Sequence, residues 1–97
     1  MVYNWDDDKN DFLREERSIS FEEIVLCISE GKLVDILDHP NKLKYPGQKV
    51  YLVNRENYIF AVPFVEDTET EEVFLKTIFP SRKYTKKYLR KLGADDE

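Results

Sequence analysis

The most regular hydrophobic pattern in the chain is helical. Its apolar residues recur at the spacing of one helix face: Phe21, Ile24, Val25 and Ile28. Just before them, Ser20 and Glu23 have the three-residue spacing of a capping box, in which each side chain accepts from the other residue's backbone amide. Gly31 offers a C-terminal stop. These signals predict a helix that starts at Ser20 and ends before Gly31.

An earlier helix is predicted over Asp7–Arg17. Asp6 is a suitable N-cap for it, and the acidic side chains in its first turn favour the positive end of a helix dipole. Residues 2–5, which precede the cap, are predicted to form a short strand or arm.

After Gly31 the pattern changes to short runs rich in β-branched and aromatic residues. They predict the strands Leu33–Leu37, Val50–Val53, Tyr58–Val65 and Val73–Phe79. Residues 39–48 contain two prolines and a glycine and should form a wide loop, whereas 54–57 fit a tight hairpin and 66–72 an acidic hairpin tip. Pro63 has no amide to donate, so its strand is expected at a sheet edge, at a bulge, or with this position turned outward.

The C-terminal segment returns to helical spacing. Ser81 can cap a helix over Arg82–Leu92, and Gly93 can end it. One side of that helix carries its larger apolar and aromatic residues: Tyr84, Tyr88, Leu89 and Leu92.

Together these elements predict a single α+β domain over residues 1–94, followed by an acidic tail at 95–97. The predicted domain has a four-stranded antiparallel meander sheet, two N-terminal helices and one C-terminal helix. A doubly wound fold is excluded because no helix separates the later strands.

Composition favours a folded chain. Hydrophobic residues make up 41% of the 97 residues and aromatic residues 13%, which is enough to form a core without a metal or a disulfide. The lone Cys27 lies in a helical run and is interpreted as a small buried hydrophobe. A reducing cytoplasm fits this cysteine usage. No apolar stretch approaches the roughly 20 residues of a bilayer span, so no membrane partner is expected.

The net charge of -5 hides a segregation along the chain. Residues 1–38 carry 11 acidic and 4 basic side chains, and residues 63–72 carry five acidic and none basic. Residues 73–94 carry seven Lys or Arg and no acid. This last segment is either a local cationic patch that attracts phosphates or an ordinary solvated helix face.

Two motifs give the chain a family resemblance. The first is Trp5-Asp6, Lys9-Asn10 and the run Ile19-Ser20-Phe21-Glu22-Glu23, and the second is Ser81-Arg82-Lys83-Tyr84-Thr85-Lys86-Lys87. They resemble the opening and closing motifs of the BrnT family, Trp-Asp-x-x-Lys-Asn with Val-Ser-Phe-Glu-Glu, and Ala-Arg-Lys-Ala-Thr-Lys-Lys. The likeness covers roughly residues 3–92, where the middle strands match only in pattern.

The resemblance implies a BrnT/RelE-like fold and the toxin role in a bacterial type II toxin–antitoxin pair. Such a toxin is a metal-independent endoribonuclease that blocks translation and is silenced by a DNA-binding, BrnA-like antitoxin in a hetero-oligomer. No cofactor is implied. The chain departs from the family where Arg17-Ser18 replaces His-Gly, Tyr84 replaces Ala, and Tyr88 replaces Glu. Lys76 sits near the place of a usual Arg.

The candidate chemistry is that of RNA cleavage without a metal. Arg82 is the first candidate to bind phosphate, because its planar guanidinium matches phosphate oxygens and it lies at a capped helix start. Lys76 and Lys83 are expected to join it in one pocket over the sheet, and solvated charges are the alternative for all three. Lys86 and Lys87 extend the RNA-binding surface.

The two tyrosines have two possible roles. Tyr84 and Tyr88 can stack on a base or supply a proton, or they can pack the helix on the sheet. Arg17 can neutralise a phosphate but cannot replace a histidine as general base, because it keeps its proton.

The other classes of chemistry are weakly signalled. His39, the only histidine, suits acid–base work, but it is interpreted as a loop residue with no catalytic role. No Cys/His cluster suggests a metal, and no Gly-rich phosphate loop or nucleophile elbow is present. The leading hypothesis is therefore a ribonuclease toxin. The alternatives are a non-catalytic BrnT-like binding or regulatory module and an unrelated RNA-binding domain.

Overall fold

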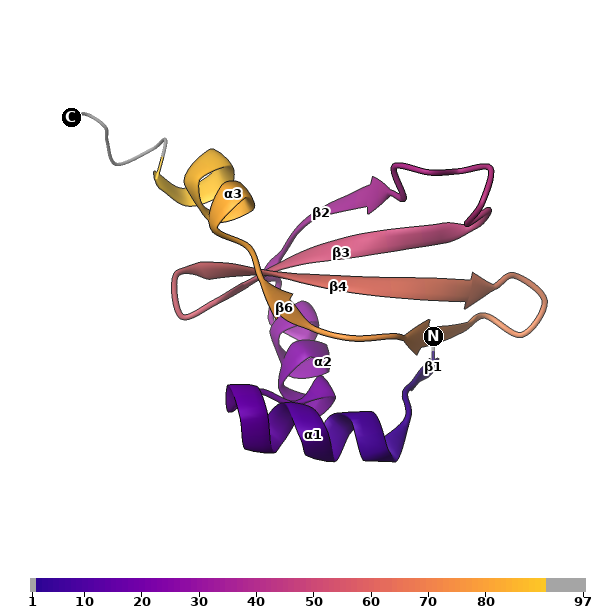
Figure 1. The fold of residues 1–97 in the computed structure, drawn as a ribbon, viewed down its shortest axis with the longest axis horizontal. Helices are drawn as coiled ribbons and strands as arrows, with labels where there is room; N and C mark the ends of the chain where they lie inside the picture. The colour runs from indigo at the N-terminus through magenta and orange to yellow at the C-terminus, as the bar shows by residue number, and fades with distance from the viewer. Residues whose placement is uncertain (1, 91–97) are drawn as a thin grey trace.

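The computed structural model describes residues 2–90. The elements follow in this order: β1 (Val2–Asn4), α1 (Asp7–Arg17), α2 (Phe21–Ser29), β2 (Leu33–Asp38), β3 (Gln48–Arg55), β4 (Tyr58–Asp67), β5 (Glu72–Leu75), β6 (Phe79–Pro80), α3 (Arg82–Thr85) and the π-helical turn η1 (Lys86–Arg90). α1 and α2 lie on one side of the sheet and α3 on the other (Figure 1). The predicted α+β class is confirmed.

The sheet differs in detail from the predicted four-stranded antiparallel meander. Its order is β1-β5-β4-β3-β2, with β6 paired to β4, and β1 runs parallel to β5 with Tyr3 opposite Val73. The described part of the chain thus has a mixed, six-stranded sheet. The extra edge was not predictable from the pattern, because β1 has only three residues and its partner lies far along the sequence.

Pro63 explains why the predicted strand Val73–Phe79 is divided. It lies inside β4, opposite Val50 of β3, and its carbonyl accepts from the Lys76 amide on the other side (2.8 Å). In an antiparallel ladder the nitrogen and the carbonyl of one residue face the same neighbouring strand. The Pro63 nitrogen, which has no hydrogen to donate, therefore also faces away from β3. Pairing with β5 ends at Phe64, and pairing with β6 covers Phe60 and Ala61. The proline therefore sits in the middle of the sheet, at the interruption between two short strands.

The two N-terminal helices begin where the sequence predicts. The Asp6 side chain accepts from the Lys9 amide at the start of α1 (3.0 Å). At the start of α2, Ser20 Oγ accepts from the Glu23 amide and the Glu23 carboxylate accepts from the Ser20 amide, both at 3.2 Å. α1 ends at Ser18, which has a left-handed backbone (φ 55°) and turns the chain into α2.

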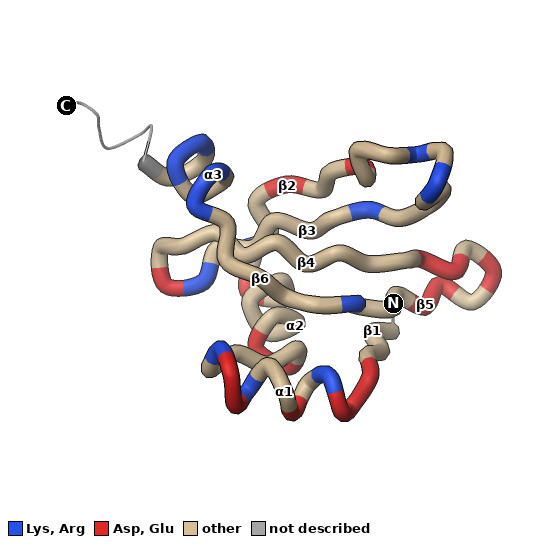
Figure 2. Tube along the Cα trace, viewed as in Figure 1, with Lys and Arg blue, Asp and Glu red and all other residues tan. Residues whose placement is uncertain are grey.

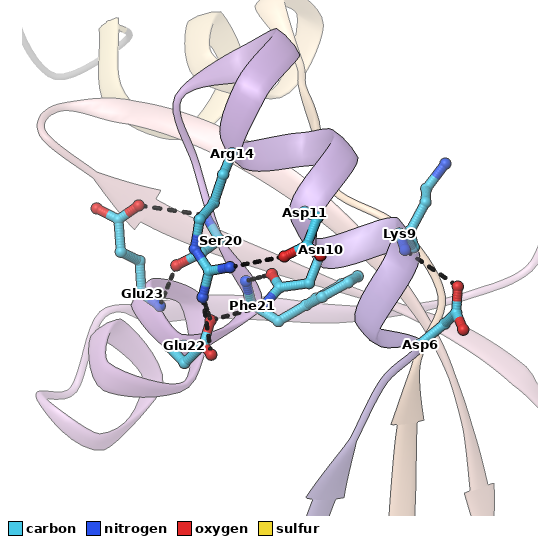
Figure 3. A network of polar contacts seen from close by, with 9 residues as sticks. All are labelled: Asp6, Lys9, Asn10, Asp11, Arg14, Ser20, Phe21, Glu22 and Glu23. Carbon is cyan, nitrogen blue, oxygen red and sulfur yellow. Dashed lines mark hydrogen bonds and ion pairs between the residues drawn. The ribbon is translucent and has the colours of Figure 1, made fainter.

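A polar network around the buried Asn10 side chain joins α1 to α2 (Figure 3). The Asn10 side chain, 3% exposed, accepts from the Phe21 amide and donates to Glu22 Oε1, both at 2.8 Å. Arg14 donates to both oxygens of the same Glu22 carboxylate (3.0 and 3.1 Å). Since Phe21 is fully buried, this network fixes the helix corner over the sheet.

The sheet face under α1 and α2 is here called the closed face. Trp5 stacks on Phe21 above it, with ring centroids 5.6 Å apart. Its buried cluster contains Leu13, Ile19, Phe21, Ile24, Tyr51, Val53, Val62, Phe64, Val73, Leu75 and Ile78. Most of the hydrophobic core is therefore on this face.

The opposite face is here called the open face, and its buried cluster contains Leu52, Ile59 and Ala61. Tyr84, Tyr88 and Leu89 of α3 and η1 pack against this cluster. The final helix was predicted as one α-helix, but it becomes a π-helical turn after Thr85. A π-turn closes hydrogen bonds from i to i+5, so residues 88 and 89 both return to the side of residue 84. The predicted Leu92, Gly93 and acidic tail lie outside the described residues.

Candidate functional site

α3 is attached to the open face by hydrogen bonds to β4. The Ser81 amide donates to the Ile59 carbonyl (2.9 Å), and Thr85 Oγ1 accepts from the Ile59 amide (2.8 Å). The Thr85 hydroxyl donates in turn to the Ser81 carbonyl (2.7 Å). Thr85 is buried, so these bonds hold the short helix at one end of the sheet.

Among residues 82–89 of α3 and η1, four cations are exposed: Arg82, Lys83, Lys86 and Lys87. This group is called the cationic segment. None of the four forms an ion pair within residues 2–90. Lys and Arg gather at α3, whereas acidic residues gather at the turn between β4 and β5 (Figure 2). Unpaired cations in this number favour a polyanionic ligand.

Beside α3, the open face is hollowed by a cavity of about 350 Å³, here called the open-face cavity. Its apolar lining consists of Leu37, Pro40, Val50, Ala61, Pro63, Phe79 and Tyr84. Asp38, His39 and Gln48 supply the polar part of the lining. The volume is within the range of small-molecule pockets, roughly 300–1,000 Å³.

The structure places His39 in the lining of this cavity together with Tyr84. His39 Nδ1 accepts from the Asn41 amide (3.0 Å), and its ring lies 4.4 Å from the Tyr45 ring between centroids. The neutral ring therefore carries its proton on Nε2. Sequence reasoning missed this neighbourhood, because it depends on how the loop 39–47 leaves the end of β2.

Lys76 does not join Arg82 and Lys83 in one pocket. Its backbone lies beside Pro63, whereas Ser81 lies beside Ile59, and four residues of a strand span roughly 13 Å. The Lys76 ammonium donates to Gln48 Oε1 (3.2 Å). Gln48 also lines the open-face cavity, so Lys76 lies near that cavity but on the side away from α3.

Arg17 and Tyr88, two further candidates, are engaged in contacts that hold the fold. Arg17 Nη1 donates to the Ile78 carbonyl (2.6 Å), which ties the end of α1 to the segment before β6. Tyr88 Oη donates to the Asp35 carboxylate (2.7 Å), which ties η1 to β2. The bond to Asp35 raises the pKa of Tyr88 and lowers the pKa of the Asp35 carboxyl. A phenol with a raised pKa holds its proton more firmly.

Tyr84 has a different environment from Tyr88. It lines the cavity, and Lys83 Nζ lies 5.2 Å from its ring centroid. Tyr84 therefore lies between the cationic segment and the cavity. Its ring packs against the cluster of Leu52, Ile59 and Ala61 and also lines the cavity.

A second cavity, of about 610 Å³, lies at the other end of the sheet. Its lining consists of Asn4, Val65, Glu66, Asp67, Thr68, Glu69, Glu72 and Phe74. The carboxylates repel phosphates, so this larger cavity is not suited to RNA. The acidic hairpin tip was predicted from the sequence, but the hollow beside it was not.

The described residues offer little for metal or thiol chemistry. Within residues 2–90, no group of three or more His, Cys, Asp or Glu is placed to hold a metal ion. Burial is the main cause of the raised pKa of the Cys27 thiol, which opposes formation of the reactive thiolate.

Comparison with protein-family models, with curated proteins and with solved structures gives no significant match for this chain. Among the described helices, none has the length and apolar composition to cross a bilayer.

Proposed function

We propose that this chain is the toxin of a bacterial type II toxin–antitoxin pair and acts on RNA as a metal-independent endoribonuclease. The observation that carries the proposal is the cationic segment, with its exposed Lys and Arg, beside a cavity lined by aromatic residues. Single-stranded RNA is commonly bound by this combination of positive charge and aromatic rings. A DNA-binding antitoxin is the proposed partner that silences the toxin.

The two BrnT-like motifs support the proposal through their positions. The first motif forms the corner of α1 and α2, and the second begins at Ser81 and forms α3 directly after the last strand. The basic motif therefore supplies most of the cationic segment. Arg82 remains the first candidate for a phosphate contact, since its side chain is exposed and a guanidinium can bind phosphate through two parallel hydrogen bonds.

Cleavage also needs a group that transfers protons. Arg17 cannot serve as a base, and Tyr88 is bound to Asp35. His39 and Tyr84 are the remaining candidates, because both line the open-face cavity and both carry a group that can transfer a proton.

In the proposed enzyme, Arg82 and its neighbouring lysines hold the phosphate. His39 accepts the proton of the attacking 2′-hydroxyl as the 2′-oxygen bonds to phosphorus, and returns it to the departing 5′-oxygen as the phosphorus–oxygen bond to that atom breaks. For this step one ring nitrogen must be free, so the bond from the Asn41 amide to Nδ1 has to open.

The test is to express the chain in bacteria with and without the proposed DNA-binding antitoxin, and to incubate purified protein with RNA in a chelator. Growth arrest by the chain alone and RNA cleavage in the chelator are expected. Arg82→Ala should reduce cleavage at least tenfold, whereas Lys49→Ala, which removes an exposed cation from β3, should not. An Arg82→Ala variant that folds and stays as toxic as the parent contradicts the phosphate role.

A second candidate is a non-catalytic BrnT-like module that binds RNA or the antitoxin. The contacts of Arg17 with Ile78 and of Tyr88 with Asp35 favour it, because both departures from the family pattern serve the fold. Harmless expression of a folded chain that binds RNA without degrading it supports this second candidate.

A further inference from the structure

We propose that the open-face cavity binds one unstacked nucleobase of a single-stranded RNA, while the cationic segment holds phosphates beside it. This inference rests on the proposed RNA-directed function and adds a specific site to it. The cavity, about 350 Å³, lies in the size range of pockets for a small ligand, and no double helix enters a hollow of this size.

The walls of the cavity suit a flat aromatic ligand. Tyr84 and Phe79 contribute rings, and Ala61 and Val50 contribute smaller apolar surfaces. Phe79 is 41% exposed although it is a large hydrophobic side chain, so a stacked base would cover surface that now faces water. Base stacking on such rings tolerates any sequence, because every base has a π-face.

The polar lining offers hydrogen bonds to the edge of a base. Lys76 donates to Gln48 Oε1, so the Gln48 amide nitrogen keeps its own donors for a ligand. His39 presents an Nε2 proton when neutral, and Asp38 presents a carboxylate that Lys42 partly balances (3.2 Å). Both donors and acceptors are therefore available, as the edges of nucleobases require.

Positive charge flanks the cavity on two sides. Lys83 lies against the Tyr84 ring on one side, and Lys76 is held by Gln48 on the other. A single strand that crosses the open face between these lysines would have phosphates near both and a base between them. A neutral apolar ligand would not need these charges, and the acidic cavity at the far end lacks them.

The test compares two phenylalanines with nearly equal exposure on the same sheet face. Phe79 lines the open-face cavity, and Phe74, 43% exposed, lines the acidic one. Binding of a fluorescently labelled single-stranded RNA heptamer to the full chain is measured by anisotropy. Phe79→Ala should weaken binding roughly five- to tenfold, and Phe74→Ala should leave it within a factor of about two. Urea unfolding of both variants checks that they fold. Equal affinities for the two folded variants overturn the proposal.

A second measurement locates the base. Adenosine monophosphate and ribose 5-phosphate, which lacks the base, are titrated against labelled protein in NMR. The site is supported if adenosine monophosphate shifts the signals of Ala61, Val50 and His39 and ribose 5-phosphate does not. Shifts confined to Lys83, Lys86 and Lys87, and equal for both ligands, mean that phosphate binds without the base and overturn it.

Separate measurements test this inference and the proposed function. Growth arrest and RNA cleavage test the function, whereas RNA affinity and NMR shifts test the base site. A toxic chain whose Phe79→Ala variant keeps full RNA affinity loses the base site and keeps the function. A harmless chain that binds the nucleotide in the cavity keeps the base site and loses the function. If Phe79→Ala weakens only binding of the antitoxin, the cavity belongs to a protein partner and the proposal is wrong.

Discussion

The two faces of the sheet use the same strands for different purposes. On the closed face, α1 and α2 bury a large cluster in which Phe21, Ile24 and Val62 are fully inaccessible. On the open face, α3 and η1 cover only one end, over Leu52, Ile59 and Ala61, and leave a cavity and exposed aromatic rings beside them. The comparison indicates that one face supplies stability and the other is available for a ligand.

Charge follows the same division. The α1–α2 corner on the closed face has ion pairs between Arg14 and Glu22 and between Glu23 and Arg55. The cationic segment on the open face makes no ion pair within the described residues. Within the described residues, most ion pairs are therefore at the α1–α2 corner, and the cations of the cationic segment are left unpaired.

The largest expected effect is the loss of a closed-face aromatic ring. Phe21→Ala should lower the free energy of unfolding by about 3–5 kcal/mol, because the cavity left under the helix corner cannot collapse fully. Phe79→Ala on the open face should cost less than about 1 kcal/mol, since that ring is already partly in water. Urea unfolding of both variants measures the difference, and similar losses would break the comparison.

The next effect is the loss of the polar network at the helix corner. Asn10→Ala leaves the buried Phe21 amide without its acceptor and should cost about 2–3 kcal/mol. The pKa of Glu22, lowered mainly by the bond from Asn10, should rise toward its usual value in NMR titration. Asp11→Ala removes only an exposed pair with Arg14 and is the matched control, expected within about 0.5 kcal/mol. A loss as small as the control's would mean that water satisfies the Phe21 amide.

A smaller effect is expected at the attachment of α3. Thr85→Val removes the acceptor of the Ile59 amide and should cost about 1–2 kcal/mol, whereas Thr85→Ser keeps the hydroxyl. Hydrogen exchange at the Ile59 amide should accelerate in Thr85→Val and stay slow in Thr85→Ser. Equal exchange rates in the two variants would show that the hydroxyl does not attach the helix.

The smallest effect is the pH dependence of the bond between Tyr88 and Asp35. The lowered pKa of Asp35 means that its contribution is present above the unfolded value, about 3.9, and is lost as pH falls through the folded value. The raised pKa of Tyr88 means that its contribution is present below about 10 and is lost as pH rises through the folded value. NMR shifts of η1 amides should therefore stay constant between about pH 5 and 9 and change outside that window. Tyr88→Phe should abolish both changes, and their persistence in that variant would assign them to another group.

Signals that act within a few residues could be predicted from the sequence. The Asp6 cap and the pairing of Ser20 with Glu23 each join residues three positions apart, so the starts of α1 and α2 follow directly from local chemistry. The strand runs were also predicted, because their apolar residues fill the two faces of the sheet. The pairing of strands that lie far apart in the sequence could not be predicted. Nothing near Val2 indicates that its neighbour in the sheet is Glu72.

The candidate site shows the same limit. The cluster of Arg82, Lys83, Lys86 and Lys87 was predictable, since these residues share one short segment. The separation of Lys76 from Arg82 was not predicted, although the proline at position 63 gave a signal for it. A proline inside an apolar strand indicates that a neighbouring strand is interrupted there, and this interruption carries the chain from Lys76 to α3. The place of His39 depends on the path of a long loop, which no local pattern encodes.

The parallel joint between β1 and β5 has a consequence for how a new molecule is made. β1 leaves the ribosome well before β5, and at 5–20 residues per second the wait for Glu72 to pair with Val2 is roughly 4–14 s. During that time Tyr3 has no strand beside it, and the edge of the nascent sheet is unfinished. A chain that stops before Glu72 therefore has no partner strand for β1, and the β1–β5 pairing can form only after β5 has been made and released.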